Sequence, residues 1–399
     1  MQEISWKDNL RIAWFGCFLT GASISLVVPF MPIFVEQLGI EGDQVAFYSG
    51  LAISVSAISA AFVSPIWGIL ADKYGRKPMM IRAGLAMTIT MGGLAFVPNV
   101  FWLLFLRFLN GVFTGFVPNA TALIASQVPK DRSGYALGTL STGVVAGTLT
   151  GPFVGGFIAE IFGIRNVFLL VGGFLFLAAI LTILFIKENF QPVPKEKALP
   201  TKELFTSVKY PYLLFNLFAT SFVIQVAAQS VGPILALYIR DLGQNENLLF
   251  VSGLIVSSMG LSSMMSSGVM GRLGDKVGNH RLLIVAQAYS ALIYLLCANA
   301  STPLELGIYR FLFGLGTGAL VPGINALLSR MTPKAGISRV FAFNQVFFYL
   351  GGVIGPLAGS VVAEKFGYHS VFYATAACVA LSCLFNLIQF RTLLKVKEI

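Results

Sequence analysis

Two arginines lie inside otherwise apolar runs of this 399-residue chain. Arg107 opens the segment Arg107-Phe-Leu-Asn-Gly111, and Arg310 opens the similar segment Arg310-Phe-Leu-Phe-Gly314. A charge at the centre of a bilayer costs about 2.5–3.5 kcal/mol on insertion scales, so it is usually kept for function or has a buried partner. Because the position is repeated, a structural role common to both segments stays open beside a functional one.

Glycines and charges form a second group between the second and third apolar runs, Gly68-x3-Asp72-x2-Gly75-Arg76-Lys77. We expect Gly68 to let two helices approach closely. We expect Asp72 to accept hydrogen bonds near the positive end of the next helix, and Arg76 and Lys77 to anchor at anionic lipid headgroups. The plainer alternative is a basic turn that follows the charge bias of membrane loops.

The second half of the chain repeats this spacing at Gly271, Asp275 and Gly278. Asn279 and His280 stand there in place of the two basic residues. The repeat is therefore degenerate, and we expect the first copy to be the stronger gate.

The sequence shows no group of residues whose types and spacing would suit enzymatic chemistry. Four cysteines lie in apolar runs without a CxxC pair, two histidines lie far apart, and no GxxxxGK[ST] loop is present. We therefore predict no enzyme, no metal and no cofactor, with the cysteines acting as small packing residues. The residues concerned are Cys17, Cys297, Cys378, Cys383, His280 and His369.

Long apolar runs must hold these residues in place. Only 11% of the residues are charged, against about a quarter in a soluble domain, and the mean hydropathy is +0.81. Runs of about 18 apolar residues or more can span a bilayer as helices. The sequence predicts an all-α integral membrane protein with spans at 12–35, 45–70, 79–97, 101–126, 134–159, 166–186, 211–239, 247–270, 282–299, 304–329, 340–363 and 367–390. The first run has no small-residue cleavage site, so we expect a span and no cleaved signal peptide.

The distribution of the 27 lysines and arginines predicts the orientation. On a twelve-span model with the N-terminus inside, loops on the other side receive only Arg165, Arg240 and Lys365. The four charges after the second run, Lys73, Arg76, Lys77 and Arg82, are counted with the cytoplasmic loops. Cytoplasmic loops carry the excess of basic residues, so both termini are predicted to be cytoplasmic, in the plasma membrane. The net charge of +10 follows from this topology and the anionic leaflet, and it gives no reason to expect nucleic acid as a partner.

The chain also divides into two related halves, predicted as 1–187 and 211–399 with a cytoplasmic linker at 188–210. The linker region is the longest polar stretch, and the halves match at a shift of 203–204 residues. Six spans in each half make a parallel repeat, in which one half rocks against the other around a central path.

The fifth run carries a stripe of small residues that includes Gly147, Gly151, Pro152 and Gly155. Glycine at every fourth position makes a flat helix face, and a proline permits a kink. Such a helix can pack closely and bend at an interface between the halves. A plain packing stripe would need the same residues.

These motifs resemble those of the major facilitator superfamily, and the fifth-run stripe is similar to the motif of its drug:proton antiporters. The resemblance extends along nearly the whole chain. It implies a protein that acts as a monomer and expels cationic or zwitterionic amphiphilic drugs, such as fluoroquinolones and dyes, as protons enter. It also implies that Arg107 takes part in proton transfer.

The proton carrier is less evident, because no acid lies deep in any span. Glu36, at the outer end of the first run, and Asp72 are the nearest acids. We expect one of them to change protonation with the help of Arg107. An ordinary helix-end charge is the alternative for Glu36.

A drug cavity should combine apolar and aromatic walls with a few polar groups. The candidates are Phe30, Phe34, Asn119, Gln225, Gln229, Asn325, Asn344, Gln345 and Phe348. For each phenylalanine the alternative is packing or contact with lipid. A narrower metabolite or sugar transporter is the rival function, although sugar sites usually need more polar groups and acids.

Overall fold

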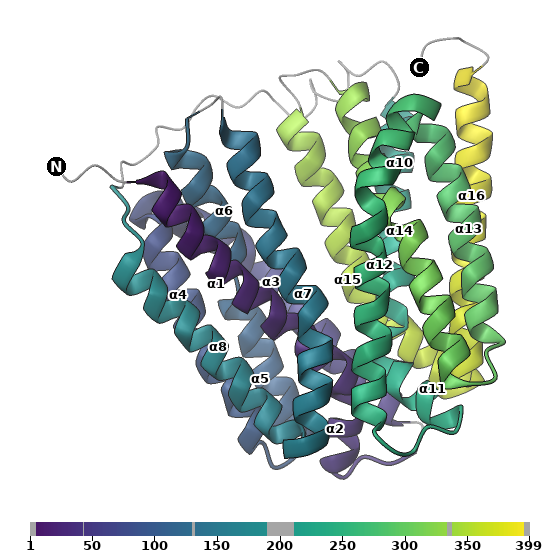
Figure 1. Ribbon diagram of the computed structural model, residues 1–399, viewed down its shortest axis with the longest axis horizontal. Coiled ribbons are helices and arrows are strands. Elements are labelled where there is room, and N and C mark those ends of the chain that lie inside the picture. Colours follow the sequence, from purple (N-terminus) through teal and green to yellow (C-terminus); the bar gives the residue numbers. More distant parts are fainter. Residues whose placement is uncertain (1–4, 43, 130–131, 190–210, 333–336, 395–399) are drawn as a thin grey trace. The chain divides into compact units, whose positions relative to one another are not determined.

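A computed structural model describes residues 5–42, 44–129, 132–189, 211–332 and 337–394, where every regular element is a helix (Figure 1). In these ranges twelve helical spans are long and apolar enough to cross a membrane. The predicted all-α membrane fold is therefore confirmed, including the third and fourth spans, which are separated at Pro98-Asn99. Asn99 begins the fourth span because its side chain accepts a hydrogen bond from the Trp102 backbone N–H at 3.2 Å.

The chain forms two compact units. The first contains Met1–Lys195 with Glu246–Ser257, and the second contains Glu196–Asn245 with Ser258–Ile399. The predicted linker lies mostly at residues 190–210, outside the described ranges, so the predicted half boundaries stay a prediction. The start of the eighth span groups with the first unit, which those boundaries do not anticipate.

Six spans build the first unit's bundle. Its elements are α1 (Trp6–Val27), η1 (Val28–Phe30), α2 (Met31–Gln37), α3 (Gln44–Tyr74), α4 (Arg76–Gly93), η2 (Leu94–Phe96), α5 (Val100–Phe113), α6 (Phe116–Gln127), α7 (Ser133–Phe162) and α8 (Ile164–Phe185). Helix α1 packs along α7 and α8, α4 packs on α8, and α3 packs on α5. Asn9, near the start of α1, accepts from the Lys187 N–H at 3.0 Å. The two ends of the six-span bundle therefore meet on one side.

The second unit repeats this arrangement. Its elements are α10 (Pro211–Ser230), η4 (Gly232–Ile234), α11 (Leu235–Asp241), α12 (Leu248–Val277), α13 (Asn279–Ala298), α14 (Pro303–Met331), α15 (Ile337–Phe366) and α16 (Tyr368–Leu394), although α12 crosses the boundary between the units. Helix α10 packs on α15, and α13 packs on α14 and α16. Asn216 donates to Asn386 at 2.7 Å, so the first and last spans of this unit also meet near their ends.

Two expectations about local structure need correction, and a third is met in part. The charge count places Arg82 with a loop although the predicted span 79–97 contains it, and Arg82 lies in the second turn of α4. A Cβ built on Gly68 would meet no heavy atom within 4 Å, so the expected close helix approach is wrong in this structure. The α7 stripe packs against α1 of the same half, since a Cβ on Gly147 would collide with the Phe18 carbonyl. Gly147 therefore packs inside its own half. The expected contact between the halves is made by the other face of the stripe, which packs on the start of α12, a segment that the predicted boundaries place in the second half.

Candidate functional site

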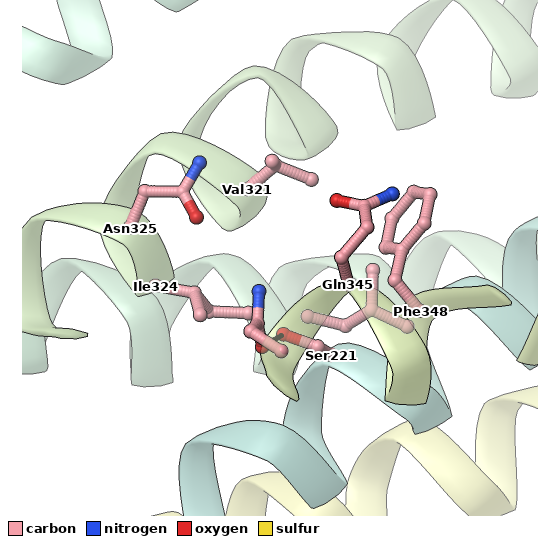
Figure 2. A pocket seen from close by; sticks show the side chains of 8 residues that line it. Ser221, Val321, Ile324, Asn325, Gln345 and Phe348 are labelled. Carbon is pink, nitrogen blue, oxygen red and sulfur yellow. Dashed lines mark hydrogen bonds between the residues drawn. The ribbon is translucent and has the colours of Figure 1, made fainter. Parts of the chain in front are cut away.

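A small cavity of about 90 Å³ lies within the second unit, among helices α10, α14 and α15. Figure 2 shows Asn325 on α14 across the cavity from Gln345 and Phe348 on α15. The cavity walls combine three carboxamides and one hydroxyl with apolar groups. They are formed by Ser221, Ile224, Val321, Ile324, Asn325, Asn344, Gln345 and Phe348.

One hydrogen bond fixes the floor of this cavity. Ser221 donates to Asn344 Oδ1 at 2.7 Å, and both residues are buried. This hydrogen bond uses only the amide oxygen of Asn344, and the amide NH₂ is a separate donor group. Gln345 is exposed, and Asn325 and Phe348 are partly exposed. Uncharged polar groups beside an aromatic ring can orient a ligand without demanding one particular charge.

Four of the predicted substrate residues, Asn325, Asn344, Gln345 and Phe348, therefore line one cavity. The predicted Gln225 and Gln229 do not. Their Cβ atoms pack against α15, where a Cβ on Gly351 or Gly355 would lie 2.8 or 2.9 Å away. Ser221 was missed, because a serine in an apolar run gives little sequence signal.

The predicted substrate residues of the first unit are less accessible. Phe30 and Phe34 are 1% and 0% exposed, and Phe34 packs against Phe168 with ring centroids 4.6 Å apart. In this structure neither ring has surface to offer a ligand, because η1 and α2 hold the two side chains inside the first unit. Asn119 is 8% exposed and donates to the Gly115 carbonyl at 2.7 Å.

Glu188 binds the backbone at the start of α4, next to the loop between α3 and α4. Its two carboxylate oxygens accept from the Arg76 and Lys77 backbone N–H groups at 2.8 and 2.7 Å. A carboxylate is favoured there by the helix dipole. The Arg76 side chain donates to the Ala71 carbonyl, and the Lys77 side chain donates to the Ile183 carbonyl. Both basic groups thus bind carbonyls near helix C-termini, and their anchoring at lipid headgroups stays a prediction.

Gly75 makes the turn itself, with φ +99° between the two helices. Gly278 has φ +100° at the repeated position, so the turn geometry is duplicated. The Asp72 and Asp275 side chains lie outside the described part of the structure, so their predicted gating roles stay predictions. Asn279 and His280, which replace the basic pair, are buried.

The two intramembrane arginines have different surroundings. Arg107 is 7% exposed, and its Nε donates to the Ala52 carbonyl at 2.9 Å while Nη1 lies 3.8 Å from Met91 Sδ. Arg310 is 4% exposed, and its Nε and Nη1 have no hydrogen-bond partner among the described residues. Position is therefore duplicated, but hydrogen bonding is not.

The remaining proton-coupling candidate, Glu36, lies in the last turn of α2 and is partly buried. This is the end of the first span, as expected. Its role in proton coupling stays a prediction.

The stripe on α7 has a second face toward the start of α12, inside the first unit. A Cβ on Gly253 would collide with the Pro152 carbonyl, and a Cβ on Gly156 would lie 2.7 Å from the Leu249 carbonyl. Glu160 accepts from the Leu249 and Phe250 N–H groups at 3.1 and 3.4 Å. Helix α7 stays continuous through Pro152.

Sequence reasoning missed a cluster in the first unit. The Arg82 guanidinium carbon lies 3.4 Å from the centroid of the Trp67 ring. This pair lies beside a break in the fourth span at Thr114-Gly115, where Gly115 has φ +132°. An arginine inside a predicted span, and a glycine followed three residues later by Pro118, were the signals that could have revealed it.

Two six-helix groups built on a repeated sequence, with a polar cavity within the span region, define a multi-pass membrane transporter. Residues 13–251 and 217–397 match the family model of the Major Facilitator Superfamily. The chain belongs to this superfamily, whose members are transporters rather than enzymes.

Similar proteins are found among drug pumps. The chain is 86% identical, over the full length of both chains, to "Multi-drug resistance efflux pump PmrA" of Streptococcus pneumoniae serotype 4. It is 52% identical to the PmrA homolog of Lactococcus lactis, over 100% of this chain and 98% of the relative. It is 45% identical to "Multidrug resistance protein MdtG" of Klebsiella pneumoniae, over 97% and 95%.

Solved structures share the fold at low sequence identity. A bacterial homolog of the human lysosomal transporter Spinster, inward-facing and occupied, aligns with a TM-score of 0.82 at 14% identity over 97% of both chains. A mutant of the nucleoside transporter NupG aligns with a TM-score of 0.80 at 13% identity over 97% of this chain and 100% of the other.

Proposed function

We propose that this chain is a proton-coupled multidrug efflux transporter that exports amphiphilic drugs, such as fluoroquinolones and cationic dyes, by alternating access. The observation that carries the proposal is the 86% identity, over the full length, with a multi-drug resistance efflux pump. Both termini are cytoplasmic in this proposal, and a monomer is the working unit.

The α10–α14–α15 cavity supports broad substrate choice. Its walls offer an aromatic ring, aliphatic groups and neutral amides, with no charged residue among the lining set. Neutral polar groups can bind ligands of differing charge at a modest cost in free energy, whereas a buried fixed charge would exclude ligands of the same charge. Asn325, Asn344, Gln345 and Phe348 are the proposed substrate-binding residues here.

The test of transport is ethidium efflux from energised cells that express the protein, with and without a protonophore. Efflux that stops when the proton gradient is discharged is the expected result. Absence of efflux, from protein shown to be folded in the membrane, would contradict the proposal and leave a narrower metabolite or sugar substrate.

The cavity is tested by Asn344→Leu, which removes the acceptor for Ser221. We expect ethidium efflux to fall about fivefold, since a lost neutral hydrogen bond is worth roughly 0.5–1.5 kcal/mol. Phe385→Ala is the matched control, because Phe385 is exposed on α16 and does not line the cavity. Equal efflux in both variants would remove the cavity from the proposal.

Proton coupling is assigned in this proposal to Glu36 or Asp72, assisted by Arg107. Arg107 is buried and donates to the Ala52 carbonyl of α3, the helix that also carries Asp72. Glu36→Gln should remove the pH dependence of efflux if Glu36 is the carrier. Undiminished pH dependence in that variant would transfer the role to Asp72, for which Asp72→Asn is the corresponding test.

A further inference from the structure

The break in the fourth span exposes backbone carbonyls that a continuous helix would use. In a continuous helix, the N–H of residue 118 would donate to the Thr114 carbonyl, but Pro118 has no N–H. The carbonyl of Val112 lies in the last turn of α5, where intrahelical donors run out. Within a membrane such carbonyls need other donors.

Two side chains from neighbouring helices supply those donors. Trp67 Nε1, on α3, donates to the Val112 carbonyl at 2.7 Å. Arg82 Nη2, on α4, donates to the Thr114 carbonyl at 3.1 Å. The stacking of Arg82 on Trp67 at 3.4 Å holds both donors together. We call this pair the Trp67–Arg82 stack.

The stack leaves Arg82 incompletely satisfied. Among the described residues, its Nε and Nη1 are closed to solvent and have no hydrogen-bond partner, and no carboxylate pairs with it. Stacking uses the flat face of the guanidinium, while the N–H bonds of Arg82 lie in the guanidinium plane and point away from the Trp67 ring. A positive charge in a membrane span with two unpaired donors favours an anionic acceptor.

The residues around the stack are partly exposed, although the two unpaired nitrogens are closed to solvent in this structure. A ligand would reach these nitrogens when the helices at the break move apart. Arg82, Trp67, Thr114 and Gly115 are each partly exposed. Gly115 lies between two donors, since a Cβ built there would be 3.4 Å from Arg82 Nη2 and 3.5 Å from Asn119 Nδ2. A side chain at this position would narrow the space beside both groups.

We propose that the Trp67–Arg82 stack is a binding subsite for the carboxylate of an amphiphilic substrate, with the ring and the open helix break receiving its apolar body. This inference rests on the proposed drug export and adds a substrate class to it. Carboxylate-bearing zwitterions would use Arg82, whereas purely cationic substrates would not.

The experiment measures transport of three probes by the full chain in proteoliposomes of zwitterionic lipid. Norfloxacin carries a carboxylate, its ethyl ester does not, and ethidium is a cation without one. The variants are Arg82→Gln and Arg82→Lys. The control is Arg11→Gln, because Arg11 is an exposed arginine of the same unit that pairs with Asp8.

We expect Arg82→Gln to lower norfloxacin transport about tenfold, the effect of losing one charge-assisted hydrogen bond. The ester and ethidium should change less than about twofold, and Arg82→Lys should recover part of the norfloxacin transport because it keeps the charge. Arg11→Gln should change none of the three.

Three outcomes would overturn the subsite. An equal fall for all three probes would assign Arg82 to holding the helix break alone. No fall for norfloxacin would show that the carboxylate binds elsewhere. Transport of all three probes that depends on added anionic lipid, and loses that dependence in Arg82→Gln, would identify a lipid headgroup as the ligand. If the unmodified protein transports no ethidium, the proposed function itself fails, which is a separate result.

Discussion

The fourth and tenth spans have similar sequences but different backbone structures. Both contain an arginine followed by a Thr-Gly pair, Thr114-Gly115 and Thr317-Gly318, and both have a proline shortly after. The fourth span breaks into α5 and α6, whereas α14 continues from Pro303 to Met331 through Pro322. A repeat in sequence therefore does not guarantee a repeat in backbone.

Spacing and neighbours explain this difference. Pro118 follows Gly115 by three residues, while Pro322 follows Gly318 by four, so the second copy has one extra residue in between. Since Gly271 matches Gly68 and Gly278 matches Gly75, Met270 and Val285 stand where Trp67 and Arg82 stand. Neither methionine nor valine has a side-chain donor. Tyr289, on α13, does donate to the Leu312 carbonyl of the tenth span at 2.8 Å, but no donor stands at the two positions that match Trp67 and Arg82. A break in the tenth span would leave the carbonyls there unsatisfied in the membrane, and the comparison teaches that a broken span needs donors from its neighbours at the break itself.

The largest expected effect comes from Gly115→Val. A β-branched residue at φ +132° is strained, and we expect destabilisation by up to about 3 kcal/mol. Thermal unfolding of purified protein measures this effect. Gly323→Ala, in α14, is the control because a Cβ there meets nothing within 4 Å. Equal melting temperatures for the two variants would show that the break does not depend on glycine.

A smaller effect is expected from Trp67→Phe, which keeps a ring under Arg82 but removes the donor to the Val112 carbonyl. An unsatisfied buried acceptor costs about 1–3 kcal/mol, so the melting temperature should fall. Met270→Leu, at the matching position of the second half, should change stability by less than about 1.5 kcal/mol. The comparison would fail if Met270→Leu were as damaging as Trp67→Phe.

The smallest effects concern the prolines. Pro118 lies in the first turn of α6, where a backbone N–H has no acceptor within the helix, so the missing N–H of the proline costs nothing. The Thr114 carbonyl already accepts a hydrogen bond from Arg82. Pro118→Ala should therefore change stability by less than about 0.5 kcal/mol. Pro322→Ala can add a hydrogen bond inside α14 and should stabilise the protein by about 1 kcal/mol. A stabilisation at Pro118 as large as that at Pro322 would mean that the Arg82–Thr114 bond contributes little.

Much of the fold could be predicted from the sequence because each span is a local property of its own residues. Run length and polarity predicted the twelve spans and the all-α fold, and Pro98-Asn99 located the turn between the third and fourth. Part of the candidate site could be predicted too, since mid-span amides such as Asn344 are costly in lipid unless they serve a purpose.

The remainder depends on residues that meet only after folding. Ser221 and Asn344 are 123 residues apart and form the cavity floor. Glu188 binds the Arg76 and Lys77 N–H groups from more than a hundred residues away. Arg82, which the charge count places with a loop, stacks on the Trp67 ring. No local pattern reports such pairs.

The sequence by itself determined the number and order of the spans, their apolar character and their duplication. The length and apolarity of a segment decide whether it can cross a bilayer. Only the tertiary structure decided which span breaks, which faces pack and which amides share a cavity. These outcomes depend on whether a neighbouring helix offers a hydrogen-bond donor or a complementary surface at the right height, and that is a property of the packed bundle.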